Sequence, residues 1–211
     1  MSEPLYLTQI LVAYEDAVRL LKIRDSYDWH QRIWQAFAGR DDAERDFLIR
    51  VDQRDDAYRV LILSRTQPVK PDWCPTDCFG TKQIPTDYFS HKTYRFSLLA
   101  NPTKKLRVDN PDGSRKKNGR RVPITQREEL IRWLDRKSEA GGFTFDPESL
   151  RTIPRGREFF RKDGAQGTHT AVEFQGTLTV CDRERFQNAV RNGIGSAKAF
   201  GFGLLALTPL F

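Results

Sequence analysis

The stretch "THTAVEFQGTLTVCDRERFQNAVRNGIGSAKAFGFGLLALT" (residues 168–208) is the clearest guide to the architecture of this chain. Residues 168–180 are rich in the β-branched and aromatic residues that favour a strand. Residues 182–193 have the pattern of a helix with Asp182 as its N-cap. The final strand is predicted over residues 200–208. The chain therefore ends in a strand, a helix and a strand.

Four glycines lie between the last residue of this helix and the start of the final strand's apolar run: Gly193, Gly195, Gly201 and Gly203. Glycine is unfavourable inside regular structure, and it is retained where the backbone needs a positive φ or where another backbone comes very close. These glycines therefore predict that another group comes very close to the backbone of this loop. The pattern alone does not identify that group.

Strands and helices also alternate in the rest of the chain, in its first half and in its second. Apolar residues at alternate positions favour strands, and an apolar stripe of period 3.6 favours helices. The predicted segments are a strand at 5–13, a helix at 26–38 that Asp25 or Ser26 caps and Gly39 ends, strands at 45–53 and 57–66, an irregular connection at 68–85, a strand at 93–102, a helix at 124–142, an extended segment at 143–160 and a hairpin tip at 161–167.

This order predicts an α+β protein with two tandem ferredoxin-like (βαββαβ) domains, the first of them abbreviated. We expect an N-terminal domain over residues 1–88 and a C-terminal domain over residues 89–211. Such sheets often bind RNA, but the fold alone does not determine a function.

The charge of the chain is unevenly distributed. Lysine and arginine total 35 against 28 aspartate and glutamate residues, which gives a net charge of +7. Basic residues are concentrated in "KKLRVDNPDGSRKKNGRR" (residues 104–121). Such a stretch is typical of phosphate-backbone binding and equally of a solvated loop, and both interpretations stay open.

Other features exclude several classes of protein. No apolar run reaches 18 residues, and the N-terminus lacks a basic segment followed by an apolar one, so we expect a soluble, cytoplasmic protein. Cys74 and Cys78 lack a second ligand pair, which favours structural thiols over a metal site. The third cysteine, Cys181, stands alone.

Tyr27 and His30 are the candidate catalytic pair. They lie three residues apart in the first turn of the predicted helix, where side chains project past the helix end and phosphate is attracted. A histidine on an apolar stripe is also a common core residue, so both interpretations stay open. Without a metal-ligand pattern, such a pair suits RNA cleavage by the 2′-hydroxyl. His91 and His169 are interpreted as structural or exposed.

Three stretches together resemble the CasE family, the CRISPR-RNA-processing endoribonucleases of type I-E systems. They are "YDWHQRIWQAF" (27–37), "YRFSLLANPTKK" (94–105) and "VEFQGTLTVCDRERFQNAVRNGIGSAKAFGFGLLAL" (172–207). The resemblance implies cleavage at the base of the repeat hairpin, without a metal or other cofactor, giving a 2′,3′-cyclic phosphate and a 5′-hydroxyl. It also implies two partners, the repeat hairpin RNA and the other subunits of the Cascade complex, and no membrane.

The resemblance assigns roles to individual residues. It places catalysis on Tyr27 and His30, without saying which is the acid and which the base. For Gly201 and Gly203, close packing between domains is the favoured interpretation. A non-catalytic RNA-binding subunit of the same fold and a basic scaffold subunit are the alternatives. The RNA-binding residues that the resemblance implies are Lys104, Lys105, Arg107, Arg157, Arg161, Lys162, Gly195, Ser196 and Lys198.

Overall fold

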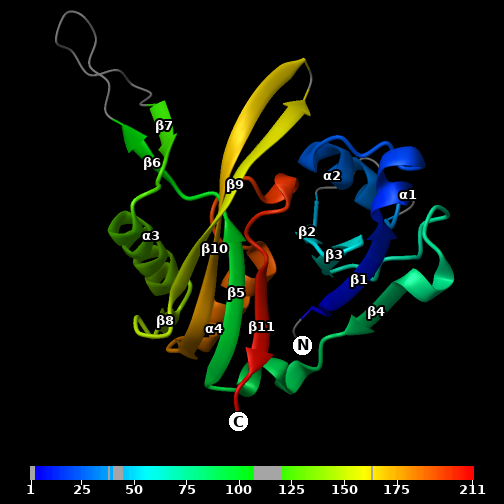
Figure 1. Cartoon of the computed structure of the whole chain (residues 1–211). Coiled ribbons are helices and arrows are strands. Elements are labelled where there is room, and N and C mark those ends of the chain that lie inside the picture. Colours follow the sequence, from blue (N-terminus) through cyan, green and yellow to red (C-terminus); the bar gives the residue numbers. More distant parts are fainter. Residues whose placement is uncertain (1–2, 38, 40–44, 107–119, 163) are drawn as a thin grey trace, which may run out of the picture.

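The computed structural model describes residues 3–37, 39, 45–106, 120–162 and 164–211. Within these residues, strands form a four-stranded sheet, a five-stranded sheet and a two-stranded hairpin. The four-stranded sheet belongs to the first half of the chain and the five-stranded sheet to the second, and the two halves lie side by side (Figure 1).

The first sheet has the strand order β2-β3-β1-β4, and all its pairs are antiparallel. This is the order of a ferredoxin-like sheet. Two helices connect its first two strands, and an irregular segment with one 3-10 turn stands where a second helix would follow β3. The elements are β1 (Tyr6–Ala13), α1 (Tyr14–Arg19), α2 (Ser26–Trp34), β2 (Phe47–Gln53), β3 (Ala57–Ser64), η1 (Thr76–Cys78) and β4 (Phe79–Gln83).

The second sheet repeats that order as β11-β5-β10-β8, with β9 also paired to β10. Both of its helices are present, and a hairpin is inserted after its first strand. The elements are η2 (Thr86–Ser90), β5 (Thr93–Ala100), β6 (Thr103–Leu106), β7 (Arg120–Pro123), α3 (Arg127–Ala140), β8 (Phe143–Phe145), β9 (Arg151–Lys162), β10 (Ala165–Val180), α4 (Arg183–Asn192), η3 (Lys198–Phe200) and β11 (Leu205–Pro209).

The predicted fold is confirmed: the chain is α+β with two ferredoxin-like sheets, the first lacking one helix. Three local predictions were wrong. Residues 79–83 form β4 although the segment 68–85 was predicted to be irregular, because pairing with β1 supplies the hydrogen bonds. The helix predicted over 26–38 ends at Trp34, and the last strand begins at Leu205. The domain boundary at residue 88 falls within η2 and stays a prediction.

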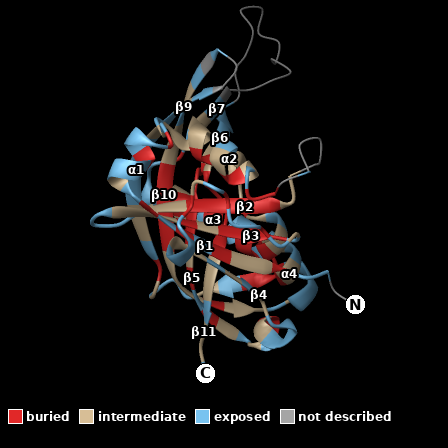
Figure 2. Cartoon of the chain, turned by 90° about the vertical axis from the view of Figure 1, so that its right-hand side faces the viewer, coloured by how far each residue is buried: buried red, intermediate tan, exposed pale blue. Residues whose placement is uncertain are grey.

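One face of the first sheet packs against its own helices. Trp29 and Ile33 of α2 lie in this core with Ile10 and Ile49 from the strands. Strand β2 is buried at residues 47–50, whereas α1 is largely exposed (Figure 2). Helix α2 is therefore fixed on the sheet by two of its apolar side chains.

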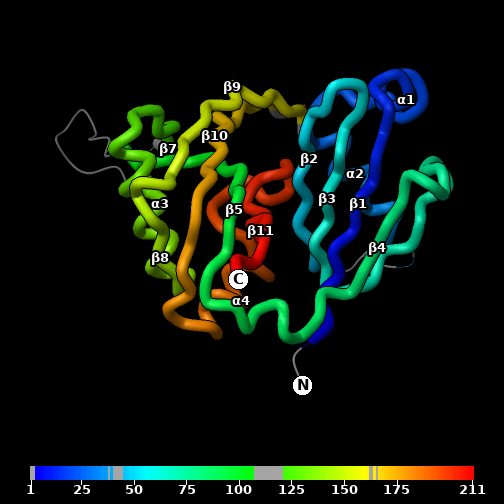
Figure 3. Tube along the Cα trace, turned by 60° about the horizontal axis from the view of Figure 1, so that its bottom comes forward, coloured from blue at the N-terminus to red at the C-terminus, as the bar shows by residue number. Residues whose placement is uncertain are grey.

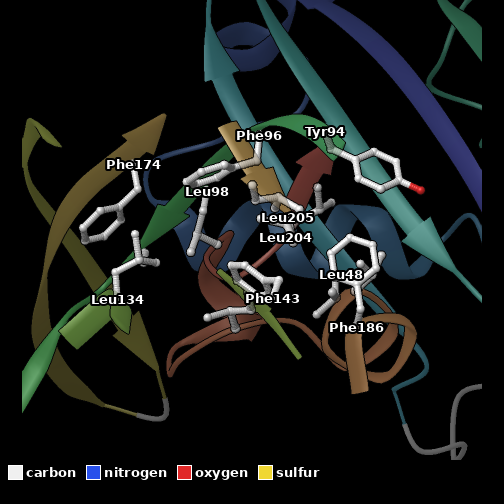
Figure 4. Packing of buried hydrophobic residues seen from close by; sticks show 14 of the residues in the cluster. Leu48, Tyr94, Phe96, Leu98, Leu134, Phe143, Phe174, Phe186, Leu204 and Leu205 are labelled. Atoms are coloured by element: carbon white, nitrogen blue, oxygen red, sulfur yellow. The ribbon is translucent and has the colours of Figure 1, made fainter. Parts of the chain in front are cut away.

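The opposite face of the first sheet packs against the second half. Leu48 of β2 lies in one apolar cluster with Phe186 of α4 and with Leu204 and Leu205 at the last strand (Figure 4). Figure 3 shows the two halves joined by the segment around η2. Because this core belongs to both halves, they form one packed body.

Two glycines of the loop before β11 are required by this packing. A Cβ on Gly193 would lie 2.9 Å from the side chain of Leu48, and one on Gly203 would lie 2.8 Å from the carbonyl oxygen of Ile194. Both residues have positive φ. Close packing at Gly203 is thus confirmed, although the atoms that a Cβ would meet belong to Ile194 and Lys198 of the same half and not to the other domain. Gly201 has open space around it and a φ of +89°, so conformation and not packing requires glycine there.

Within the described part of the chain, no helix is long and apolar enough to cross a membrane.

Candidate active site

Helix α2 begins at a side-chain cap. The Asp25 carboxylate accepts hydrogen bonds from the backbone N–H groups of Tyr27 and Asp28, at 2.8 and 3.1 Å. Of the two predicted caps, Asp25 is therefore the one used. Its other carboxylate oxygen accepts from the backbone N–H of Arg161 on β9 at 3.0 Å. One carboxylate thus joins the start of α2 to the β9–β10 hairpin.

Tyr27 and His30 lie on one edge of α2, away from its fully buried positions. Both are half-buried, and their ring centroids are 6.1 Å apart. The imidazole also lies 5.9 Å from the ring of Phe47 at the start of β2. The fully buried positions of this helix are taken by Trp29 and Ile33. The predicted pair is therefore brought together, outside the deepest part of the core.

The imidazole of His30 accepts a hydrogen bond from the next turn of the helix. The indole Nε1 of Trp34 lies 3.1 Å from Nε2 of His30. Because an indole N–H can only donate, Nε2 is the acceptor and carries no proton in this arrangement.

The glycine-rich loop brings an aromatic ring and a cation to the same edge of α2. Phe200 of η3 lies 6.0 Å from Tyr27, ring to ring. Burial lowers the pKa of Lys198, and the nearby charges of Arg45 and Lys137 lower it further. Burial also lowers the pKa of Arg45. Neither Arg45 nor Lys198 forms an ion pair with any residue that the structure describes. Two cations without a carboxylate partner among the described residues therefore lie on segments next to α2: Lys198 in η3, which packs on α2, and Arg45 two residues before Phe47, whose ring contacts His30.

The β9–β10 hairpin reaches α2 because it bends. The pairing register shifts between Ala171 and Val172, and Gly156 on the opposite strand has a φ of +92°. Beyond this bulge the hairpin projects past the sheet toward α2 (Figure 1). Arg157 and Arg161 are exposed on it. Lys162 ends β9, and its side chain lies outside what the structure describes.

An aromatic cluster connects this hairpin to η3. Phe160 stacks on His169 with 4.6 Å between centroids, and Phe200 contacts both rings at 4.4 and 4.8 Å. The side-chain amide of Asn101 lies 3.0 Å from Nδ1 of His169, and burial lowers the pKa of that histidine. These contacts are consistent with the interpretation of His169 as a structural residue, and they hold its ring between the hairpin, η3 and the end of β5.

A cleft of about 800 Å³ opens between the two halves beside the N-terminus of α2. Its floor carries Arg50, which binds Glu173 at 2.8 Å across the halves. Burial raises the pKa of Glu173, but hydrogen bonds from Ser97, Gln175 and two arginines outweigh burial and bring it to about 2. Burial without such partners raises the pKa of Glu158 to about 7. Tyr27 and His30 do not line this cleft.

The lysines after β5 differ in their surroundings. Lys104 donates to both carboxylate oxygens of Glu129 on α3, at 2.6 and 2.8 Å, so its charge is already paired. Lys105 is exposed, and no ion pair to it occurs within the described residues. Arg107 lies outside the described residues.

The two remaining predicted residues, Gly195 and Ser196, lie in the loop after α4 and contact other elements of the second half. Gly195 has a φ of +92°, and a Cβ on it would lie 3.3 Å from the Trp133 ring. The hydroxyl of Ser196 donates to the backbone carbonyl of Asn101 at 3.4 Å. Their backbone is therefore held between α3 and the end of β5.

The three cysteines differ in their exposure to solvent. Cys74 is buried, Cys78 is half-buried and Cys181 is exposed, and all three are free. Among the side chains that the structure describes, no three metal-binding groups lie together.

Sequence reasoning missed three residues of this site. Trp34 lay on the stripe with Tyr27 and His30, and its spacing of four from His30 was an available signal for a contact. Arg45 and Phe200 carried no such signal, because only the packing of η3 on α2 and β2 brings them to the pair.

Comparison with known proteins gives consistent matches. The family model described as CRISPR associated protein matches residues 5–209. The protein called "CRISPR system Cascade subunit CasE" from Escherichia coli (strain K12) is 34% identical over 211 residues, covering 98% of this chain and 100% of the relative. The Thermus thermophilus protein called "CRISPR-associated endoribonuclease Cse3" is 27% identical, covering 97% and 100%.

Solved structures agree with these matches. Thermus thermophilus Cse3 bound to an RNA representing a pre-cleavage complex superimposes with a TM-score of 0.74, at 26% identity, covering 98% of this chain and 100% of that one. The family model and the 34%-identical relative both extend over nearly the whole length, and the chain therefore belongs to the CasE family of CRISPR-associated proteins.

Proposed function

We propose that this chain is an endoribonuclease that cleaves CRISPR precursor RNA at the base of the repeat hairpin and stays bound as a subunit of the type I-E Cascade complex. The observation that carries the proposal is the placement of Tyr27 and His30 together on one edge of α2, with η3 of the second half packed beside them. The relatives named a Cascade subunit and an endoribonuclease support CRISPR RNA processing for this chain.

The proposed reaction uses a nucleophile that the RNA itself carries. A general base removes the proton of the 2′-hydroxyl, and O2′ bonds to the adjacent phosphorus. The bond from phosphorus to O5′ breaks, and a general acid protonates O5′. The products are a 2′,3′-cyclic phosphate and a 5′-hydroxyl. Tyr27 and His30 supply the acid and the base, so the proposed reaction needs no metal ion.

The two cations stabilise the charge that develops on the phosphate. Lys198 lies in η3, which packs on α2, and Arg45 lies just before β2, and neither has a carboxylate partner among the described residues. Fixed cations in a partly dehydrated site stabilise such charge more strongly than they would in water. Arg45 thereby joins the residues inferred from the sequence.

RNA binding is proposed for the surface that carries the hairpin and the basic strand. Arg157, Arg161 and Lys105 are exposed. Phosphate contacts from such side chains contribute most of the affinity for RNA and make it depend on salt. The set proposed earlier also includes Lys104, Arg107, Lys162 and the backbone at Gly195 and Ser196. Because the substrate is cellular RNA, the cytoplasm is the compartment we propose.

A non-catalytic RNA-binding subunit is the second candidate, and one observation favours it. The Nε2 atom of His30, the atom needed to accept a proton, is occupied by the indole N–H of Trp34. A histidine that only packs in the protein would make such a contact too.

Cleavage of a labelled repeat-hairpin RNA in EDTA distinguishes the two candidates. The proposal expects a single cut at the base of the hairpin in EDTA, with a cyclic phosphate on the 5′ fragment. The second candidate expects tight binding and intact RNA, both in EDTA and with added magnesium. A cut that appears only with magnesium would contradict the proposed mechanism while preserving an endoribonuclease.

A further inference from the structure

Trp34 is held firmly against His30. Its indole N–H points at Nε2, and the two rings are nearly perpendicular at 79°. The indole also packs edge-on against Phe37 and Phe47, with centroids 6.5 and 5.0 Å away. Phe37 and Phe47 stack on each other at 4.6 Å, so the indole packs against a fixed pair of rings, which keeps its N–H directed at the imidazole.

This contact determines where the proton of His30 lies. An indole nitrogen donates and never accepts, so Nε2 must offer its lone pair. In a neutral imidazole the proton then lies on Nδ1, because the hydrogen bond at one ring nitrogen sets the state of the other. A protonated ring would present an N–H to the indole N–H, so the contact favours the neutral form.

We propose that Trp34 is a positioning residue for His30. Its N–H selects the neutral imidazole with the proton on Nδ1, and it holds the Nε2 lone pair in place until the RNA takes over that hydrogen bond. The consequence for cleavage rests on the proposed function, whereas the state of His30 in the free protein does not.

The inference assigns roles to the two catalytic residues. On RNA binding, the 2′-hydroxyl replaces the indole N–H as the donor to Nε2. Nε2 then accepts the 2′-hydroxyl proton as the bond from O2′ to phosphorus forms. As the bond to O5′ breaks, the phenol of Tyr27 gives its proton to O5′. A neutral imidazole is thus the base and Tyr27 the acid.

Charged groups also lie on α2 and on the elements packed around it. Because they are unchanged in a Trp34 variant, a comparison of variants isolates the effect of the indole N–H. These groups are Asp25 and Asp28 on α2, Arg45 and Asp46 before β2, Glu158 and Arg161 on β9, and Lys198 on η3.

The first test uses the unaltered protein. Nitrogen NMR of the histidine side chains, with His30 identified by the His30→Ala spectrum, reports which ring nitrogen carries the proton. We expect a neutral imidazole with its proton on Nδ1 at pH 7.5. A proton on Nε2 would overturn the inference, and this measurement needs neither a variant at Trp34 nor catalytic activity.

The second test removes the N–H and keeps an aromatic ring. Trp34→Phe should raise the pKa of His30 by roughly 0.5 to 1 unit, the size of one hydrogen bond to the neutral form. Trp29→Phe is the matched control, because Trp29 lies on the same helix and packs instead on Tyr58. Melting curves check that both variants fold. Equal pKa values of His30 in the Trp34→Phe variant and the unaltered protein would overturn the inference.

The third test reads the same effect in cleavage. In single-turnover experiments at protein concentrations well below saturation, where the rate reports the free protein, the acidic limb of the rate–pH profile should move to higher pH in Trp34→Phe by the same amount as the NMR pKa, with hairpin affinity within about twofold. If the NMR pKa of His30 moves but the acidic limb of the rate–pH profile does not, the assignment of His30 as the base is overturned. If the unaltered protein does not cleave at all, the proposed function fails while the two NMR tests still decide the role of Trp34.

Discussion

Helices α2 and α3 occupy the same place in two sheets of the same strand order, yet they carry different chemistry. Each follows the first strand of its sheet and precedes the second. Helix α3 buries Leu130, Trp133 and Leu134 and exposes most of its other residues. Helix α2 buries Trp29 and Ile33 and holds a second set of aromatic residues half-buried at its edge.

The difference arises from what packs beside each helix. The edge of α2 meets η3 and the bent part of β9, both supplied by the second half. Helix α3 meets only β8 to a comparable extent within the described residues, and its outer face is charged. Two helices in equivalent positions of the two sheets therefore differ in the groups that surround them. The chemistry is proposed to lie in the first half, and most of the RNA-binding charge in the second.

The largest effect is expected from His30→Ala. Proton transfer by one positioned side chain contributes about 10²–10⁴-fold to a rate, so the single-turnover cleavage rate should fall by that factor. Hairpin affinity should change little, because it rests on many phosphate contacts. The control is His91→Ala in the second half, where the ring contacts Tyr94 and Phe211. A folded His30→Ala protein that cleaves at the normal rate would make His30 a packing residue.

The second largest effect is expected on the free energy of unfolding, from the ion pair that connects the two halves. Glu173→Gln removes the charge that binds buried Arg50 across the two sheets. Breaking a buried ion pair costs about 3–5 kcal/mol, to be measured by urea unfolding at pH 7. The control Glu15→Gln breaks an exposed pair with Arg19, worth about 0–1 kcal/mol. Equal stability of the two variants would mean that this ion pair does not hold the halves together.

Neutralising exposed cations of the second half should weaken RNA binding without affecting chemistry. Lys105→Met and Arg161→Gln should each reduce the slope of log K against log salt by roughly one, if each contacts one phosphate. The cleavage rate at saturating RNA should stay the same. Lys82→Met, on the distant edge strand β4, is the control. An unchanged slope in the first two variants would show that their charges only face solvent.

The last effect is expected at Glu158, and it appears only as a change of stability with pH. Its folded pKa of about 7 lies above the ordinary value of 4.5, so the native state holds the proton more tightly than the unfolded chain. The stability from this group is present at low pH and is lost as the pH rises from about 4.5 to 7. In the Glu158→Gln variant, the free energy of unfolding should not show this decrease between about pH 4.5 and 7. Parallel stability–pH curves for the variant and the unaltered protein would contradict it.

Local features were the most predictable from the sequence. The caps of α2 and α4 at Asp25 and Asp182 follow from residues next to each helix. The common helical position of Tyr27 and His30 follows from their spacing alone. The strand order could be expected because the alternation of elements restricts the topology.

Features that depend on distant partners could not be predicted. Strand β4 contains a glycine and polar residues, and it exists because β1 offers a free edge. The partners of His169, namely Phe160 and Phe200, are brought to it by the hairpin bend and by η3. The pairing of Lys104 with Glu129 depends on how α3 packs beside β6. In each case the sequence contains the residues but not the contact.

A substrate with a single 2′-deoxy substitution on the 5′ side of the scissile phosphate tests the central claim most directly. This change removes the attacking oxygen, while one hydroxyl contributes little to an interface of many phosphate contacts. The account predicts that the substituted RNA binds with nearly the parent affinity and is not cut at that position, with or without magnesium, whereas the parent is cut in EDTA. Efficient cutting of the deoxy RNA would mean that water is the nucleophile, and it would remove Tyr27 and His30 from their proposed roles.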